Sequence, residues 1–356
     1  MTEGQGLNGR ILVWGAGAIG GTVGAHLKRA GHPVAFVDAN PEHVMRIREV
    51  GLQVSGPAGA FKIHAPVWMP TEVTGTYDRI LLCVRAHQTV DAVRQLYAHL
   101  SDEGCVVSLQ NGLNAGHIAQ LVGARRTVAG FLNFGALYQR PGHVLYAGRG
   151  ALGLGELDGT RTPRIEELRD LLAVFEPTAF ATANIWGYLW GKLGYVALLF
   201  ATALTTDPVA DCLDRPEFMR LFHALAVEVM TTAMLEKVSP EGFNGFEPDA
   251  FLAGAEPGRV RASLDAIAAH NRRSAKTHSE AWQDIVVHNR RTEVDTLVGV
   301  VPEIAERHGL ETPLLRRLTT MVHEVEAGRR PQALVNLDEL GRVLDPARLT
   351  VPVRRG

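Results

Sequence analysis

Three glycines near the N-terminus have the spacing of a dinucleotide-binding turn. Gly15, Gly17 and Gly20 come directly after an apolar run and open a helical stretch. In such a motif the first glycine permits a tight turn, the second lets the backbone approach a pyrophosphate, and the third lets the helix pack closely on the sheet. The N–H groups of Ala18 and Ile19 at the helix start would face the phosphates. The spacing therefore predicts a dinucleotide cofactor.

Asp38 indicates which dinucleotide is bound. It ends the next apolar run, close to the distance of about 20 residues expected for an acid that hydrogen-bonds the adenosine ribose. A carboxylate at this position repels a 2′-phosphate, and the two residues after it supply no arginine. NAD is therefore favoured. NADP remains the alternative, because Arg46 and Arg48 follow on a predicted helix.

A single lysine interrupts a long apolar segment further along the chain. Ile185–Leu204 is long enough to cross a membrane, but Lys192 lies near its middle, where a charge costs several kcal/mol in lipid. A buried helix is the better interpretation. Reduction of a carbonyl builds negative charge on oxygen and needs a proton donor, so Lys192 is a candidate general acid. Alternatively, its stem packs and its ammonium reaches water.

Polar residues are dense in a second segment, which contains Lys276, His278, Ser279 and Glu280. They suit either a substrate pocket or a solvated turn. Glu293 follows after a short interval, where it could equally complement a helix dipole as a first-turn acid. No pattern in the chain has the spacing of a metal site.

The first half of the chain alternates short β-rich runs with helical stretches. Such alternation predicts an α/β fold with a parallel, doubly wound, Rossmann-type sheet, whose ligands bind at the carboxyl ends of the strands. The expected strands are Arg10–Trp14, Val34–Val37, Arg79–Val84, Cys105–Leu109, Thr127–Asn133, Gly142–Ala147 and Leu152–Glu156. The expected helices are Ala18–Ala30, Pro41–Glu49, Thr89–His99, Asn114–Leu121 and Pro163–Val174.

After Phe180 the strand patterns stop and helical patterns dominate. The expected helices are Tyr188–Leu204, Pro216–Glu236, Gly258–Asn271, Glu293–His308, Pro313–Ala327 and Leu334–Leu344. We therefore expect a dinucleotide-binding domain over residues 1–180 and a mostly α-helical substrate and catalytic domain over 181–356. The tail Arg348–Gly356 is expected to be loosely ordered.

Composition narrows the class of protein. The 356 residues are 46% hydrophobic and 21% charged, as in soluble globular proteins, and the net charge of −2 gives no reason to expect nucleic acid or an anionic membrane as a partner. Three cysteines without paired spacing read as reduced thiols. With no signal-peptide pattern at the N-terminus, we expect a cytoplasmic protein that acts on a small molecule. The oligomeric state stays open, with a homodimer as one option.

Five blocks in order resemble the ketopantoate reductase (2-dehydropantoate 2-reductase) family. They are Gly15-Ala16-Gly17-Ala18-Ile19-Gly20, Val84-Arg85-Ala86-His87-Gln88-Thr89, Gln110-Asn111-Gly112-Leu113, Asn184-Ile185-Trp186-Gly187-Tyr188-Leu189-Trp190-Gly191-Lys192-Leu193 and Arg291-Thr292-Glu293-Val294-Asp295. The resemblance implies a Rossmann domain joined to a helical domain with substrate between them. It further implies Lys192 as general acid, Glu293 near substrate and nicotinamide ribose, Arg85 in a cofactor-binding block, and Asn111 at the cofactor–substrate junction.

Several positions depart from the family pattern. Arg85 stands where a lysine is usual, which keeps the charge but not the shape. Val196 and Phe200 occupy the places of two asparagines that hold the ketoacid. The family's carboxylate-binding serine matches Glu280, or Ser279 if the register slips by one. A site with these substitutions is poorly matched to ketopantoate, so we expect the hydride chemistry to be inherited and the substrate to be different.

Three functions remain open from the sequence. The leading interpretation is an oxidoreductase that transfers hydride between NAD(H) and a small hydroxy or oxo compound, with Lys192 as general acid and base. The second is a genuine 2-dehydropantoate 2-reductase that uses NADPH. The third is a non-catalytic dinucleotide-binding protein, which the presence of both Lys192 and Glu293 disfavours.

Overall fold

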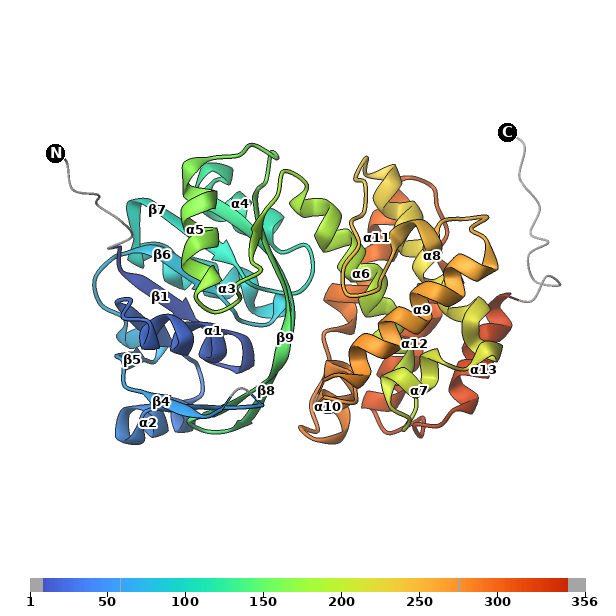
Figure 1. Ribbon diagram of the computed structural model, residues 1–356, viewed down its shortest axis with the longest axis horizontal. Coiled ribbons are helices and arrows are strands. Elements are labelled where there is room, and N and C mark those ends of the chain that lie inside the picture. The colour runs from blue at the N-terminus through green and yellow to red at the C-terminus, as the bar shows by residue number, and fades with distance from the viewer. Residues whose placement is uncertain (1–8, 58, 275, 345–356) are drawn as a thin grey trace. The chain divides into compact units, whose positions relative to one another are not determined.

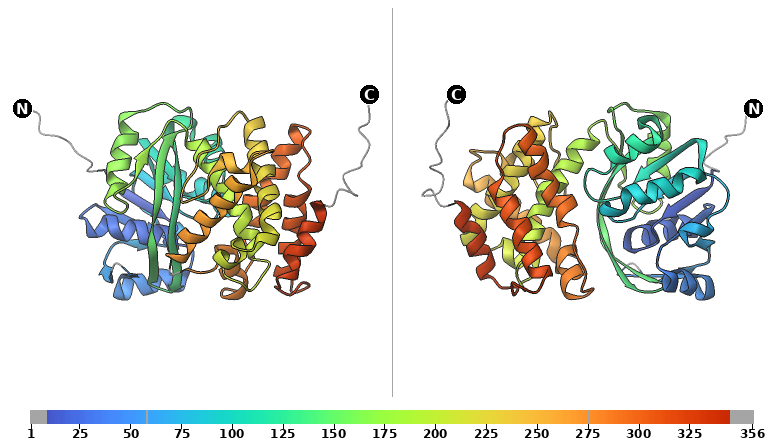
Figure 2. Two further views of the ribbon diagram at one scale, coloured as in Figure 1. Left: turned by 45° about the vertical axis from the view of Figure 1, so that its right-hand side comes forward. Right: turned by 180° about the vertical axis from the view of Figure 1, so that it is seen from behind.

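The computed structural model describes residues 9–57, 59–274 and 276–344 (Figure 1). The chain divides into two compact units, Met1–Ile185 and Trp186–Gly356. The first is built on a β-sheet with helices, and the second is helical (Figure 2). Residues 1–8, on which the expectation about a signal peptide falls, and the tail Arg348–Gly356 lie outside the described residues.

A ten-stranded mixed sheet organises the first unit. Across the sheet the order is β4 (Phe61–Ile63), β3 (Leu52–Ser55), β9 (His143–Glu156), β8 (Thr127–Arg140), β7 (Leu100–Ser108), β6 (Tyr77–Leu82), β1 (Ile11–Trp14), β2 (Val34–Val37) and β5 (Val67–Trp68), and β10 (Phe180–Ala181) pairs with β9. The stretch from β8 to β5 is parallel throughout. It contains the strands whose ends carry the glycine turn and Asp38.

Helices cover both faces of this sheet, as a doubly wound fold requires. They are α1 (Ala18–Arg29), α2 (Pro41–Val50), α3 (Thr89–Leu96), α4 (Ala115–Val122) and α5 (Pro163–Ala173). One core contains Leu27 of α1 and Leu171 of α5, and a second core contains Val93 of α3 and Ile118 of α4. The predicted fold class, a Rossmann-type domain followed by a mostly helical one, is confirmed.

The prediction of an entirely parallel sheet is wrong at one side. β8 and β9 form a long antiparallel hairpin, and β3 pairs antiparallel with β4 (Figure 1). The two predicted strands Gly142–Ala147 and Leu152–Glu156 correspond to the single strand β9, which runs on through Gly148 and Gly150. In the structure a Cβ at Gly150 would lie 1.7 Å from the Asn133 carbonyl oxygen, so this glycine permits close approach of the two strands. The short strands β3, β4, β5 and β10 were not predicted.

The second unit contains the predicted helices and two short additional ones. Its helices are α6 (Ile185–Thr202), α7 (Val209–Leu213), α8 (Met219–Leu235), α9 (Pro257–Arg272), α10 (Glu280–Val286), α11 (Val300–Arg307), α12 (Pro313–Glu326) and α13 (Val335–Gly341). The helices α7 and α10 were not predicted. The helix expected from Glu293 contains a π-helical turn, Asp295–Gly299, before α11 begins.

One helical stretch among the described residues, Pro216–Leu235, has the length and composition to cross a membrane. Half of its apolar window is buried inside the protein, as in the core helix of a soluble domain. Ile185–Leu204, the segment that the sequence raises, forms α6, and most of its side chains are buried.

Candidate active site

The glycine turn after β1 has the geometry that its spacing predicts. Gly15 has a φ of +100°, a conformation that favours glycine. A Cβ at Gly20 would lie 2.0 Å from the Gly15 carbonyl oxygen, so the start of α1 packs directly on the turn. A Cβ at Gly17, in contrast, would meet nothing within 4 Å. The backbone at Gly17 therefore faces open space, as approach of a pyrophosphate requires.

The N-terminus of α1 is suited to an anion. No side chain caps it at Gly17, and no acidic residue lies in its first turn. Asp38, at the end of β2, accepts hydrogen bonds from the N–H groups of Ala16 and Asn40, both at 2.9 Å. The structure therefore brings Asp38 against the glycine turn, where a carboxylate would meet the adenosine ribose.

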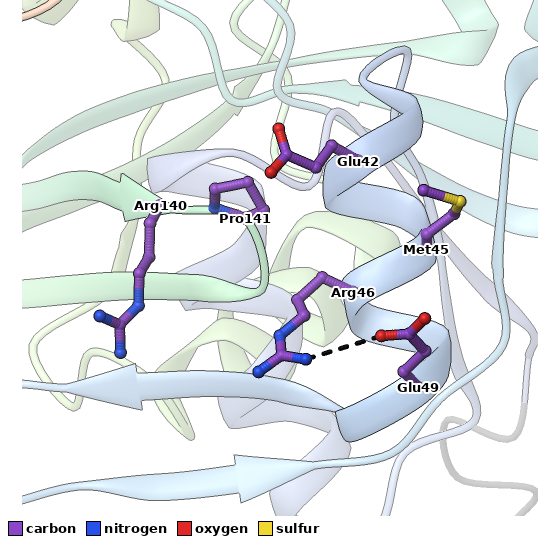
Figure 3. A pocket seen from close by; sticks show the side chains of 6 residues that line it. All are labelled: Glu42, Met45, Arg46, Glu49, Arg140 and Pro141. Carbon is purple, nitrogen blue, oxygen red and sulfur yellow. Dashed lines mark ion pairs between the residues drawn. The ribbon is translucent and has the colours of Figure 1, made fainter.

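Arg46 and Arg48, the two arginines that leave NADP possible as cofactor, both interact with other residues of the protein. Arg48 donates to the Val67 carbonyl oxygen at 2.9 Å and pairs with Glu72 at 2.5 Å. Arg46 pairs with Glu49 at 3.6 Å and borders a shallow hollow of about 300 Å³ between α2 and the β8–β9 turn (Figure 3). The hollow is lined by Glu42, Met45, Arg46, Glu49, Arg140 and Pro141. The Arg48 side chain thus anchors α2 to Val67 and Glu72.

Two polar residues that were not predicted as site residues hold the loops of this unit. Gln110 donates to the Val84 carbonyl oxygen at 2.9 Å and to Thr89 Oγ1 at 2.8 Å, which ties together the loops that carry Arg85 and Asn111. His43 is fully buried. Its Nδ1 accepts from the Gly142 N–H at 2.9 Å, so its Nε2–H donates to the Ala16 carbonyl oxygen at 3.0 Å. A polar residue on an otherwise apolar helix face is the pattern that could have indicated His43.

Lys192 lies on α6 in the second unit and is 9% exposed. The pKa of its ammonium is lowered to about 7, because burial and, to a smaller extent, the charge of Lys276 lower it, while the charge of Glu293 opposes both. The fold thus brings Lys192, Lys276 and Glu293, which are far apart in the sequence, within electrostatic reach of one another. An amine with a pKa near neutrality can both donate and accept a proton at working pH.

The polar residues before and at the start of α10 are engaged within the protein. Lys276 forms an ion pair with Glu280 at 2.6 Å. Ser279 is buried, and its hydroxyl caps α10 by accepting the Trp282 N–H at 3.2 Å. His278 stacks on the Trp282 ring with centroids 4.0 Å apart, and its Nε2 bonds with the Thr206 carbonyl oxygen at 3.2 Å. The polar groups of Ser279 and His278 are therefore used by the protein itself.

Val196 and Phe200 lie one and two turns after Lys192 on α6. They are 7% and 4% exposed. Residues spaced by four share one face of a helix, so these apolar side chains extend from the lysine along one line. Glu293 lies just before the π-helical turn, and its carbonyl oxygen accepts the Leu297 N–H at 3.0 Å. Among the described residues, no cluster of His, Cys, Asp and Glu has the arrangement of a metal site.

A glycine turn for a pyrophosphate and a buried lysine of lowered pKa define a nicotinamide-dependent oxidoreductase, and comparison with known proteins agrees. The family models "Ketopantoate reductase PanE/ApbA" and "Ketopantoate reductase PanE/ApbA C terminal" match residues 11–159 and 184–326. The chain belongs to the ketopantoate reductase family, as its motifs predict, and is an NAD(P)-dependent oxidoreductase.

Relatives match over nearly their whole length. The 2-dehydropantoate 2-reductase of Halobacterium salinarum is 29% identical over 88% of this chain and 97% of its own, and that of Archaeoglobus fulgidus is 28% identical over 90% and 98%. Among solved structures, D-mandelate dehydrogenase with NADH and anilino(oxo)acetate has a TM-score of 0.79 at 22% identity, covering 90% of this chain and 99% of its own. A ketopantoate reductase from Ralstonia eutropha has a TM-score of 0.76 at 24% identity, with the same coverage.

Proposed function

We propose that the protein transfers hydride between NAD(H) and a small hydroxy or oxo compound other than ketopantoate, with Lys192 as general acid and base. The observation that carries the proposal is the burial of Lys192 near Lys276 and Glu293, with its pKa lowered to about 7. Such a pKa suits a group that must give up a proton in one direction and take it back in the other.

The steps follow from the charges at the site. A reduced nicotinamide cofactor, whose pyrophosphate the glycine turn at Gly15, Gly17 and Gly20 would hold, would supply the hydride for the carbonyl carbon. Lys192 donates its proton to the carbonyl oxygen as negative charge develops there, so the product is an alcohol and the lysine is left neutral. In the oxidative direction the neutral amine takes the hydroxyl proton. The Glu293 carboxylate favours the charged form of Lys192 before the transfer, and the Lys276 ammonium opposes it.

The cofactor assignment rests on Asp38 and on Arg48. The carboxylate beside the glycine turn favours a free ribose diol, and the Arg48 guanidinium is engaged by Val67 and Glu72. The solved D-mandelate dehydrogenase complexes contain NADH. Together these observations support NAD over NADP.

The substrate assignment rests on Val196 and Phe200. A substrate that lies along α6 beside Lys192 would meet these apolar side chains, which favours an apolar substituent next to the reacting carbon. The D-mandelate dehydrogenase complex contains anilino(oxo)acetate. We therefore place oxo acids with apolar substituents first among the candidates.

Genuine 2-dehydropantoate 2-reductase activity is the second candidate. One observation favours it, because the Halobacterium salinarum and Archaeoglobus fulgidus relatives bear that name and match over almost their full length. A non-catalytic role is the least supported, since Lys192 is buried near a carboxylate and a second ammonium.

We expect a cytoplasmic enzyme, and a homodimer is one option because a solved Staphylococcus aureus ketopantoate reductase is described as dimeric.

Steady-state kinetics on the purified protein separates these candidates. Oxidation of NADH and of NADPH is followed with ketopantoate and with a panel of oxo acids that carry branched or aromatic substituents. We expect turnover of at least one apolar oxo acid and weak or absent turnover of ketopantoate. A kcat/KM for ketopantoate above about 10⁴ M⁻¹s⁻¹, an ordinary enzyme value, would refute the changed substrate. Cofactor binding without turnover of any compound would favour the non-catalytic alternative.

A further inference from the structure

Helix α12 holds the segment that carries Glu293 from both sides. The N–H and hydroxyl of Thr292 both donate to one oxygen of Glu326, at 2.8 and 2.6 Å. Two residues after Glu293, the Asp295 carboxylate bonds with His323 Nε2 at 2.8 Å. The backbone before and after Glu293 is therefore anchored to the last turn of the same helix.

The two anchors are joined through His323. Its Nδ1 bonds with the second oxygen of Glu326 at 2.9 Å, so each ring nitrogen faces a carboxylate. Only the imidazolium has an N–H on both nitrogens, so the doubly bonded arrangement needs protonated His323. Burial lowers the pKa of His323, but the hydrogen bonds and charges of Glu326 and Asp295 outweigh burial and raise it.

The backbone that follows Glu293 is of a kind that needs support. Asp295–Gly299 forms a π-helical turn, which is rare and occurs often at functional sites. The Glu293 carbonyl oxygen accepts the Leu297 N–H at 3.0 Å and the Thr296 hydroxyl at 3.2 Å, so Glu293 makes an ordinary helical bond two residues before the π-helical turn begins.

The other charged groups that neighbouring helices present to α12 bind at different places. Glu228 of α8 accepts the Leu314 and Leu315 N–H groups at the first turn. Glu306 of α11 pairs with Arg316, and Glu339 of α13 pairs with Arg317. Among the described residues, Asp295 and Glu326 are the charged groups hydrogen-bonded to His323.

We propose that His323 and Glu326 are positioning residues, and that they fix Glu293 beside Lys192 by clamping Thr292 and Asp295. The proposal rests on the proposed function in that Lys192 is the proton donor and Glu293 favours its charged form. When His323 loses its proton, one of its two bonds is lost. The Asp295 bond gives way, because that carboxylate is 70% exposed and can be solvated, whereas the Glu326 side chain is 6% exposed.

The clamp is tested without a substrate, by NMR titration of Lys192 in the full chain. The chain has only five lysines, Lys28, Lys62, Lys192, Lys237 and Lys276. Lysine labelled with ¹³C at Cε therefore gives a simple spectrum, in which Lys192→Met assigns the signal. The variants are Thr292→Val, which removes the hydroxyl between Glu326 and the Val294 N–H, and His323→Gln, which removes the imidazolium.

Both variants are expected to lower the pKa of Lys192, because Glu293 then spends more time further from the ammonium. A displacement of 1–2 Å corresponds to a fall of about half a pH unit or more. Thr292→Ser should restore the wild-type value. Thr320→Val is the matched control, because that exposed hydroxyl bonds only to the Arg316 carbonyl oxygen of its own helix.

An unchanged pKa of Lys192 in folded His323→Gln and Thr292→Val would overturn the clamp. His323→Gln alone decides the question if Thr292→Val does not fold, because the histidine is partly exposed. The clamp is judged by the difference between variant and wild type. The proposed function is judged by the wild-type value, since an ordinary lysine pKa in the wild type would contradict the role of Lys192 whatever the variants show.

Discussion

At the scale of single residues, the proposed chemistry depends on the burial of the Lys192 amine. Lys192 is an ordinary lysine by sequence, and its pKa near 7 results from burial on α6 and from the Lys276 ammonium. The Glu293 carboxylate raises the pKa again, by less than the Lys276 ammonium lowers it. Burial and two neighbouring charged side chains therefore set the pKa of the candidate proton donor.

Replacement of Lys192 by methionine should remove the proton donor and keep the apolar stem. We expect kcat to fall by about 10²–10⁴, with NADH affinity nearly unchanged, because the cofactor turn lies on the N-terminal unit. Stopped-flow NADH fluorescence and steady-state kinetics measure the two effects. A variant within threefold of wild type in kcat would assign the donor elsewhere, to Lys276 or His278.

The pH profile gives the control for this variant. Reduction needs the protonated lysine, so wild-type kcat/KM for reduction should fall as the pH rises through about 7, and oxidation should rise over the same interval. The Lys192→Met variant should lose this dependence while remaining slow. A wild-type profile flat from pH 6 to 8 would contradict the assignment.

Asp38 should decide the cofactor. We expect NAD(H) to bind at least tenfold more tightly than NADP(H), about 1.4 kcal/mol, because the carboxylate accepts from the ribose diol and repels a 2′-phosphate. Fluorescence titration with both reduced cofactors measures the difference. Asp38→Ser should narrow it, although the hydrogen bond from the Ala16 N–H is then lost as well. Equal affinities in the wild type would disprove the preference for NAD.

At the scale of elements, α6 carries both the candidate proton donor and the residues that we expect to set the specificity. Val196 and Phe200 follow Lys192 at intervals of four residues and present an apolar face. A hydrogen-bonding ketoacid would leave its polar groups unpaired there, at about 1–3 kcal/mol for each lost partner. Val196→Asn with Phe200→Asn should therefore raise kcat/KM for ketopantoate and lower it for apolar oxo acids. Thermal unfolding checks that the double variant folds, and a fall for both substrates would contradict the idea.

Helix α12 depends on a cap supplied by another helix. Glu228 of α8 accepts the Leu314 and Leu315 N–H groups at 3.0 and 2.9 Å, which no residue within α12 caps. Glu228→Ala should lower the free energy of unfolding by about 1–3 kcal/mol, measured in urea, because two N–H groups lose their acceptor. Glu228→Gln keeps one oxygen and is the conservative control. An alanine variant as stable as wild type would show that water replaces the cap.

The same cap should give stability a pH dependence. Burial raises the pKa of Glu228 to about 7, against the two N–H donors that lower it. The folded-state pKa lies above the unfolded value, so the protonated Glu228 carboxyl is the form that folding favours. The stability that this preference contributes is fully present below about pH 4.5 and is lost as the pH rises through 7. The Gln variant should lack this part of the slope.

At the scale of the whole molecule, two compact units should respond differently to the cofactor. Burial raises the pKa of Cys105 in the first unit and raises that of Cys212 in the second to about 11, so labelling of these two buried thiols should require unfolding. NADH at 100 times its Kd should stabilise the first unit by about 2.7 kcal/mol.

Labelling of Cys105 should then slow by about a hundredfold, and labelling of Cys212 should change little. Mass spectrometry of labelled peptides with and without NADH measures each site. Equal protection of the two thiols would show that the two units unfold together.

The sequence by itself determined the fold class, the family, the glycine turn with Asp38 and the isolated lysine. These features are local, because turn geometry, helix periodicity and a charge within an apolar run depend on neighbours along the chain. The antiparallel β8–β9 hairpin was beyond this reasoning. Its glycines look like breaks in a strand, whereas in the structure they permit two strands to approach.

Only the tertiary structure decided how the candidate site is tuned and supported. The pKa of Lys192 depends on Lys276 and Glu293, and the segment around Glu293 depends on His323 of α12. These partners are distant in sequence and produce no periodic pattern in it, because electrostatic and hydrogen-bonded contacts require only that two groups lie close together in the folded chain. Burial and through-space charge are properties of the folded chain, so the sequence could single out Lys192 as a candidate but could not give its pKa.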